Sequence, residues 1–204
     1  MTELILASTS PARKKLLTEA GIRFTDRSPG VDEDLEVELH KPETAEQLTE
    51  LLARKKAEAV AATAANAIVL GCDSALLLEG EILGKPLTAE VATARWGKLR
   101  GNSGTLYSGH HLIDTESKQA TSLVTKTEVN FSDLSDDQIA RYVATGEPLQ
   151  VAGAFTIDGL GGAFIESISG DYHTVVGLSL VGLRKMITEL SHDHQVGLRR
   201  SFSS

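Results

Sequence analysis

The sequence predicts a mixed α/β fold, because helix and strand signals alternate along its 204 residues. Apolar runs of strand length are separated by segments that begin at hydroxyl caps and end at glycine. The hydrophobic share of 41% and the charged share of 24% are typical of a soluble globular protein. A chain of this length can bury a substantial core. We therefore expect a single domain over residues 1–190, followed by a polar C-terminal tail over residues 191–204.

The first predicted element is an apolar strand at residues 4–7, which runs through hydroxyl residues into a helix. Ser10 is a suitable N-cap, Pro11 occupies the first helical position, and Gly21 ends the helix. The free N–H groups and the dipole of such a helix favour an anion, and Arg13 with the two lysines after it can close over one. The alternative is an ordinary capped surface helix with solvated cations.

Capping residues also mark the starts of later helices. Thr44 with Gln47, and Ser135 with Gln138, match the capping box at two helix starts. After the first helix, we expect a strand at 23–27, an acidic loop at 31–34 and a helix at 44–65. A buried strand at 67–71 that ends at residues 72–74, a hairpin at 75–83 and a helix at 88–99 follow. The remaining elements are strands at 105–113 and 121–131, a helix from 135 to before 146, a glycine-rich segment at 159–162, a strand at 163–168 and a last helix ending near 190.

Composition excludes several classes of function. The 20 basic and 28 acidic residues give a net charge of −8, which argues against a nucleic-acid polymer as partner but not against a small anion. Cys72 is the lone cysteine, so an internal disulfide and a cysteine zinc site are excluded, and a reducing compartment is favoured. No apolar stretch has the length of a membrane span, and the N-terminus lacks the pattern of a signal peptide. We expect a cytoplasmic location and no membrane partner.

Two acidic positions are candidates for chemistry. Asp73 is expected at the C-terminal end of a buried strand, where a carboxylate can bind Mg²⁺ or accept a proton from water. The alternative is a strand-end aspartate that caps a turn. Glu33, within an acidic run, offers hard oxygen ligands, although such runs are usually solvated surface.

Two lysines complete the candidate set. The apolar stripe of the helix at 44–65 places Lys55 or Lys56 at its inward edge. An inward Lys56 requires an acidic partner or an anionic ligand, unless its stem packs on the surface with the ammonium in water. Lys85 lies in a tight Gly-Lys-Pro loop. These cations and carboxylates together suit phosphoryl or nucleotidyl chemistry assisted by a divalent metal.

Other notable residues are interpreted as structural. The segment 159–162 lacks the P-loop ending, and we interpret it as a close backbone approach that lines a pocket. His110, His111 and His173 lack metal-ligand spacing, and Cys72 is expected to be a buried apolar residue. No serine lies in a Gly-x-Ser-x-Gly elbow, so a Ser/His/Asp hydrolase is not predicted.

From residue 4 to about residue 190, the chain resembles the Maf family of nucleoside triphosphate pyrophosphatases. Several motifs occur in the family's order, and they are Leu6-Ala7-Ser8-Thr9-Ser10-Pro11-Ala12-Arg13, Val31-Asp32-Glu33, Lys56-Ala57, Gly71-Cys72-Asp73-Ser74, Gly80-Glu81-Ile82-Leu83-Gly84-Lys85-Pro86, Gly146-Glu147-Pro148-Leu149, Ala152-Gly153-Ala154-Phe155 and Val175-Val176-Gly177-Leu178. The resemblance implies an elongated mixed sheet with flanking helices, of the inosine-triphosphatase-like kind. It also implies cleavage between the α- and β-phosphates, a divalent cation such as Mg²⁺ or Mn²⁺, and a homodimer.

The resemblance also assigns roles to residues of this sequence. Asp73, Glu33 and Lys56 would be catalytic, with Asp73 as proton acceptor and with Glu33 and Asp73 as metal ligands. The triphosphate would be held by Ser8, Arg13, Lys56 and Lys85.

Three positions that would contact the base depart from the family pattern, and they are Ala12, Ser74 and Asp158. The expected substrates are dTTP and UTP or modified nucleotides such as 7-methyl-GTP. The alternatives from other classes are a non-catalytic nucleotide-binding regulator of septum formation and a metal-dependent phosphomonoesterase.

Overall fold

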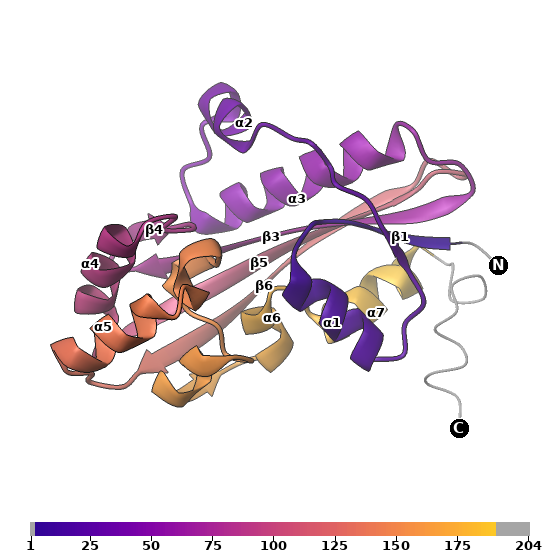
Figure 1. Ribbon diagram of the computed structural model, residues 1–204. Coiled ribbons are helices and arrows are strands. Elements are labelled where there is room, and N and C mark those ends of the chain that lie inside the picture. The colour runs from indigo at the N-terminus through magenta and orange to yellow at the C-terminus, as the bar shows by residue number, and fades with distance from the viewer. Residues whose placement is uncertain (1–2, 191–204) are drawn as a thin grey trace. The chain divides into compact units, whose positions relative to one another are not determined.

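The computed structural model describes residues 3–190 as a mixed α/β structure (Figure 1), which confirms the predicted fold class. The strands are β1 (Glu3–Ala7), β2 (Thr25–Asp26), β3 (Ala67–Leu78), β4 (Glu81–Leu83), β5 (Ser103–Asp114), β6 (Ala120–Phe131) and β7 (Ile165–Ser169). The helices are α1 (Pro11–Glu19), α2 (Glu33–His40), α3 (Ala45–Ala61), α4 (Ala89–Leu99), α5 (Asp136–Ala144), α6 (Tyr172–Val176) and α7 (Leu180–Glu189). Three short 3₁₀ turns span Glu147–Gln150, Ala152–Ala154 and Leu160–Phe164. The predicted tail at 191–204 lies outside the described residues.

The strands form one seven-stranded mixed sheet in the order β2-β1-β3-β5-β6-β7, with β4 paired to β3. β1 runs parallel to both β2 and β3, whereas β4 is antiparallel to β3 and β7 is antiparallel to β6. Among residues 3–190, none of the helices combines the length and the apolar character that crossing a bilayer requires.

The chain divides into two compact units. Of the described residues, the first unit comprises 3–73, 108–125 and 177–190, and the second comprises 74–107 and 126–176. The prediction of one domain over residues 1–190 stays a prediction.

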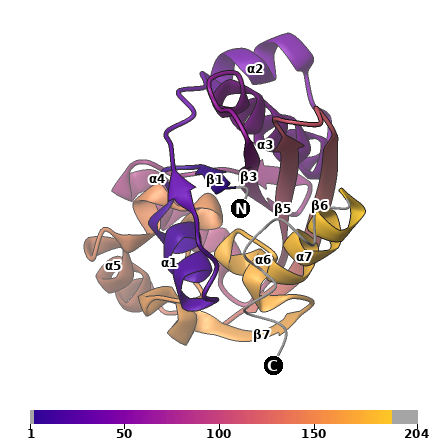
Figure 2. The same cartoon turned by 90° about the vertical axis from the view of Figure 1, so that its right-hand side faces the viewer.

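In the first unit, α3 covers one face of the strands, and α1 and α7 cover the other (Figures 1 and 2). α3 lies very close to the sheet at two glycines. A Cβ on Gly71 would lie 2.0 Å from the carbonyl oxygen of Ala53, and one on Gly109 would lie 2.2 Å from that of Thr49. Only glycine permits this approach, which brings the inward face of α3 directly onto β3.

The helix starts follow the predicted caps. The hydroxyls of Ser10, Thr44, Thr88 and Ser135 each accept a hydrogen bond from the backbone N–H three residues later. The capping box is complete at Ser135. At Thr44 it is not, because the side chain of Gln47 accepts from the N–H of Glu43 instead. α3 also ends at Ala61 rather than near residue 65.

Two local predictions around the site were wrong. The acidic run at 31–34 is not a loop, because Asp32 caps α2 through the N–H of Leu35 at 3.1 Å and the acidic residues favour the positive end of that helix. The strand at 67–71 does not end at Asp73 but continues to Leu78 as the single strand β3. The hairpin predicted at 75–83 is present as the antiparallel pair of β3 and β4, but its first strand is continuous with the strand at 67–71.

The second unit packs around Trp96, which is fully buried. Its ring makes edge-to-face contacts with Phe131, Tyr142 and Phe164, and its Nε1–H donates to the carbonyl of Ala154 at 2.8 Å. The predicted helix after Thr88 and the helix after Ser135, α4 and α5, pack against each other in this unit.

Candidate functional site

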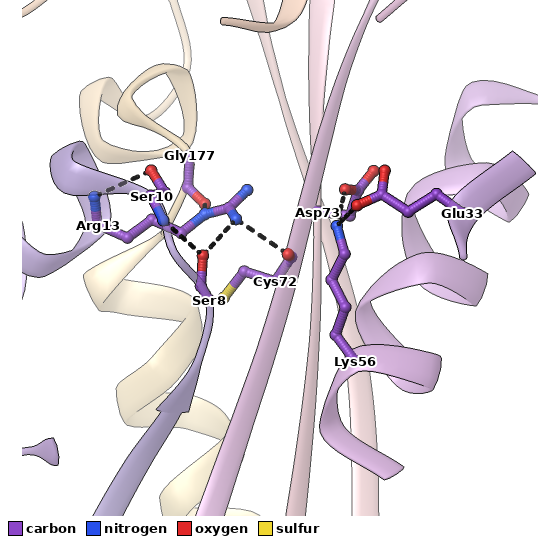
Figure 3. Close-up of polar contacts among 8 residues, drawn as sticks. All are labelled: Ser8, Ser10, Arg13, Glu33, Lys56, Cys72, Asp73 and Gly177. Carbon is purple, nitrogen blue, oxygen red and sulfur yellow. Dashed lines mark hydrogen bonds and ion pairs between the residues drawn. The ribbon is translucent and has the colours of Figure 1, made fainter. Parts of the chain in front are cut away.

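Arg13 is buried near the start of α1, with 8% of its surface exposed. Its Nε–H donates to the carbonyl of Gly177 at 2.8 Å, and its Nη1 donates to the hydroxyl of Ser8 at 3.1 Å and to the carbonyl of Cys72 at 3.0 Å (Figure 3). These three partners are neutral oxygens, and they fix the plane of the guanidinium.

The turn between β1 and α1 is ordered by its own hydroxyls. The N–H of Ser10 donates to the Oγ of Ser8 at 3.2 Å, and the Oγ of Ser10 accepts from the N–H of Arg13 at 3.5 Å. Of the three consecutive cations in α1, Arg13 is the buried one. Lys14 forms an ion pair with Asp26, the last residue of β2.

Lys56 and Asp73 form a buried ion pair, in which Nζ lies 2.6 Å from Oδ1. The Nζ also lies 2.8 Å from Oε1 of Glu33, whose side chain is 44% exposed. The sequence left open whether Lys55 or Lys56 faces inward, and the structure selects Lys56. Lys55 instead pairs with Glu36 of α2 at 3.1 Å. The inward lysine thus has the acidic partner that its burial requires.

The electrostatic environment of Asp73 favours its protonated form more than water does. Burial raises the pKa of this carboxyl above its ordinary value, and the nearby carboxylate of Glu33 adds to the rise. The charge and hydrogen bond of Lys56, together with the charge of Arg13, act in the opposite direction. A carboxylate with a raised pKa is a stronger base than an ordinary aspartate, which suits proton transfer.

The two groups of residues appear on opposite sides of β3 in Figure 3. Successive side chains of a strand point to opposite faces, so Asp73 shares the face of Gly71, against α3, whereas Cys72 points the other way. The Cys72 thiol is fully buried, and desolvation raises its pKa to about 11. This confirms the interpretation of Cys72 as a buried apolar residue, while its backbone carbonyl orients Arg13.

Five of the predicted site residues thus lie in the first unit, where the structure gathers them into two groups: Ser8 with Arg13, and Lys56 with Glu33 and Asp73. Ala12 is half-buried in the first turn of α1 beside them. The other three belong to the second unit, where Ser74 and Asp158 are half-buried and Lys85 is exposed.

In the second unit, the glycine-rich segment surrounds a carboxylate of the protein itself. Glu147 accepts hydrogen bonds from the N–H groups of Leu160 and Gly161, both at 2.9 Å, and from the hydroxyls of Tyr142 and Thr156. Burial and the bond to Glu147 raise the pKa of the Tyr142 phenol. The close approach predicted for 159–162 is therefore present, with this side chain as its partner, and the pocket that the segment was expected to line stays a prediction.

Two backbone groups of the site were not predicted from the sequence. The carbonyls of Cys72 and Gly177 hold Arg13, yet neither lies near it in the chain. Gly177 carried one usable cue, because glycine is favoured where φ is positive, and its φ is 112°.

The carboxylates of the site bear on the divalent metal that the resemblance implies. Among residues 3–190, no group of three or more His, Cys, Asp or Glu side chains forms a complete protein cage. Asp73 and Glu33, however, place two carboxylate oxygens around one point, the Nζ of Lys56. Mg²⁺ is commonly held by one or two carboxylates together with substrate phosphates, so these residues fit such an ion.

Fold and site together define an open-sheet α/β protein with a charged site around its strand β3. The particular family follows from comparison with known proteins. A family model described as Maf-like protein matches residues 3–190, and the chain belongs to this family.

Curated relatives carry a consistent name. The chain is 50% identical over 193 residues to the nucleoside triphosphate pyrophosphatase of Salinispora tropica, covering 92% of this chain and 84% of that protein. It is 50% identical over 189 residues to the protein of the same name from Streptomyces avermitilis, covering 92% and 90%. A third relative of that name, from Trichormus variabilis, is 45% identical over 192 residues, covering 94% and 95%.

Proposed function

We propose that this protein is a nucleoside triphosphate pyrophosphatase, a hydrolase of acid anhydrides that releases a nucleoside monophosphate and pyrophosphate. The observation that carries the proposal is the buried pair of Lys56 and Asp73 beside Glu33, with Arg13 held in a fixed plane. Membership of the Maf-like family and the name shared by its relatives support the same activity.

In the proposed reaction, water attacks the α-phosphorus while Asp73 accepts a proton from it. A bond forms between the water oxygen and the α-phosphorus, and the bond from that phosphorus to the bridging oxygen breaks, so pyrophosphate leaves. The raised pKa of Asp73 supports its role as base. Lys56 orients the carboxylate, and its ammonium opposes the effect of burial on the pKa of Asp73.

Arg13 would bind and orient the triphosphate. Charge redistributes over the phosphoryl oxygens in the transition state, and a guanidinium fixed by neutral acceptors requires little reorganisation to stabilise it. Ser8 orders both Arg13 and the turn that precedes α1, where helix N–H groups favour an anion. A contribution of Lys85 to phosphate binding stays a prediction.

We further propose that a divalent cation takes part, held by Asp73 and Glu33 together with phosphate oxygens. Such an ion would neutralise phosphate charge and lower the pKa of bound water. The two carboxylates around Lys56 support this, because they are hard oxygen ligands at one point of the site.

For the base, we propose a broadened preference that includes dTTP and UTP and modified purine nucleotides such as 7-methyl-GTP. The small side chains of Ala12 and Ser74 leave room for a larger ring, and a carboxylate at position 158 would accept the paired N–H donors of a guanine-type edge. The homodimer and the cytoplasmic location also stay predictions.

A product assay with a panel of nucleotides tests the activity. Purified protein is incubated in water enriched in ¹⁸O with each triphosphate, and pyrophosphate, orthophosphate and monophosphate are quantified separately. We expect pyrophosphate and monophosphate in equal amounts, with the ¹⁸O in the monophosphate. Label in the pyrophosphate would mean attack at the β-phosphorus.

The same assay separates the alternatives. Orthophosphate as the released product would show a phosphomonoesterase, and a nucleotide that binds without any product would show a regulator. Asp73→Asn serves as the inactive control for contaminating hydrolases. Asp34→Asn, at an exposed carboxylate of the same acidic run as Glu33, serves as the active control.

A further inference from the structure

We propose that His110 is a positioning residue for Arg13, which acts by fixing the backbone of residues 177–179. His110 lies on β5 and is completely buried, with no exposed surface. The N–H of Ser179 donates to its Nε2 at 2.9 Å, and its Nδ1 lies 3.2 Å from the carbonyl oxygen of Leu123. The ring therefore bridges β6 and the segment that leads into α7.

The partners of His110 determine its tautomer. A backbone N–H can only donate, so Nε2 must be the unprotonated nitrogen that accepts from Ser179. The proton then lies on Nδ1, which donates to the carbonyl of Leu123. The neutral imidazole ring thus makes one hydrogen bond as donor and one as acceptor, and both of its partners are backbone groups.

Ser179 lies two residues from the carbonyl that holds Arg13. The Nε–H of Arg13 donates to the oxygen of Gly177 at 2.8 Å. Gly177 has a positive φ of 112°, a conformation that leaves its carbonyl direction dependent on the groups that fix the chain beside it. Ser179 is fixed from both sides, because its N–H is held by His110 and its hydroxyl caps α7 through the N–H of Gly182 at 2.9 Å.

The resulting chain of contacts runs from His110 through Ser179 and Gly177 to Arg13. Every member belongs to the first unit, although the residues come from β5, the segment before α7, and α1. A guanidinium orients a ligand only when its own plane is fixed. Loss of the histidine acceptor would therefore weaken the orientation of the Arg13 side chain, while its positive charge would remain in the site. The link from Arg13 to catalysis rests on the proposed function, whereas the link from His110 to Arg13 does not.

Three substitutions separate this role from simple core packing. His110→Gln can place an amide oxygen near the position of Nε2 and so keep an acceptor for Ser179. His110→Asn is polar too but reaches only the position of Nδ1, and His110→Leu keeps bulk without either hydrogen bond. His111→Leu is the matched control, because His111 is the next residue on β5, points to the opposite face, and lies 2.7 Å from the hydroxyl of Ser122 through Nδ1.

The primary measurement is the ¹⁵N–¹H signal of the Arg13 Nε–H group, its chemical shift and its exchange with solvent, in the full chain without nucleotide. We expect the wild-type signal in His110→Gln and His111→Leu. In His110→Asn and His110→Leu we expect a shifted signal and exchange at least about tenfold faster, because the bond to Gly177 is weakened. Should His110→Leu fail to fold, the comparison of the Gln and Asn variants decides the question.

Kinetics provide the second measurement. We expect kcat/KM to fall about tenfold in His110→Asn and to be restored in His110→Gln, and we expect no further fall when His110→Asn is added to Arg13→Ala. An Arg13 signal that is equally unchanged in all the His110 variants would overturn the proposal. If the wild-type protein released no pyrophosphate, the proposed function would fail, and the Arg13 signal would still decide the role of His110.

Discussion

Lys56 and Asp73 lie 17 positions apart in the sequence, and their charged atoms meet at 2.6 Å on the buried face between α3 and β3. The meeting depends on Gly71, because any side chain there would collide with the backbone of α3 at Ala53. Gly71 therefore sets how closely α3 packs on β3, and this close packing brings Lys56 to Asp73. Burial raises the pKa of Asp73, and the contact with Lys56 opposes that rise while it orients the carboxylate for the proposed reaction.

Replacing Asp73 by Asn is expected to abolish turnover while the fold remains intact. Asparagine keeps the size and hydrogen bonding of the side chain but loses the base and the charge that a metal requires. Loss of a general base lowers rates by roughly 10²–10⁴-fold. Pyrophosphate release under saturating nucleotide measures the effect, and circular dichroism checks the fold. A variant that keeps more than about a tenth of the wild-type rate, far above the range for a lost base, would show that Asp73 is not the proton acceptor.

The same substitution is expected to raise the free energy of unfolding near neutral pH. Because the pKa of Asp73 is raised in the folded protein, its protonated form is favoured by folding, and stability is lost as the pH rises through that pKa. Asparagine is neutral at every pH, and Glu33 still accompanies Lys56 in the variant.

The stability difference should depend on pH in a defined direction. We expect the variant and the wild type to be closest below the ordinary carboxyl pKa of 3.8 and to diverge as the pH rises above it. Urea denaturation between pH 3.5 and pH 8 measures this difference. A wild-type advantage that grows with pH would mean that the ion pair with Lys56 outweighs the cost of burial.

Arg13→Ala is expected to raise KM and lower kcat together, because the guanidinium would contact the phosphates in both the bound and the transition state. Arg13→Lys is expected to restore only part of the activity, since an ammonium cannot reproduce the hydrogen bonds to Ser8, Cys72 and Gly177 at once. Steady-state kinetics of both variants test this, with the exposed Lys15→Ala as control. Unchanged constants in Arg13→Ala would return this residue to a purely structural role.

Pyrophosphate release is expected to require added Mg²⁺ or Mn²⁺ and to stop when a chelator is present, with no change in the fold. Titration of the metal against initial rate measures the requirement, and Glu33→Gln should weaken apparent metal affinity more than the exposed control Glu38→Gln does. Full activity in excess chelator would remove the metal from the proposed mechanism.

Asp158→Gln is expected to shift the preference toward dTTP and UTP by roughly tenfold, which corresponds to about 1.4 kcal/mol of differential transition-state binding. Glutamine presents both a donor and an acceptor, as the edge of uracil or thymine requires, whereas a carboxylate only accepts. The ratio of kcat/KM for UTP and 7-methyl-GTP measures the shift. Equal ratios in the variant and the wild type would show that Asp158 does not contact the base.

The sequence by itself determined the fold class, the starts of four helices and the residue types of the site. Caps such as Ser10 and Ser135 act on an N–H three residues away, so the signal and its effect lie in the same short segment. The cap at Asp32 was equally local, and its helix could have been predicted from the acidic residues of its first turn.

Only the tertiary structure decided how the site is assembled. β3 continues through Asp73 because the segment that pairs with β1 and the first strand of the predicted hairpin are one strand, and the pairing with β1 joins segments far apart in the sequence. Lys56 rather than Lys55 faces inward because the backbone of α3 packs directly against Gly71 and Gly109. Arg13 is fixed by a carbonyl 164 residues away, through hydrogen bonds to backbone atoms that every residue possesses. Such contacts depend on which distant segments the fold brings together, and residue type alone does not specify those segments, because every residue carries a backbone carbonyl.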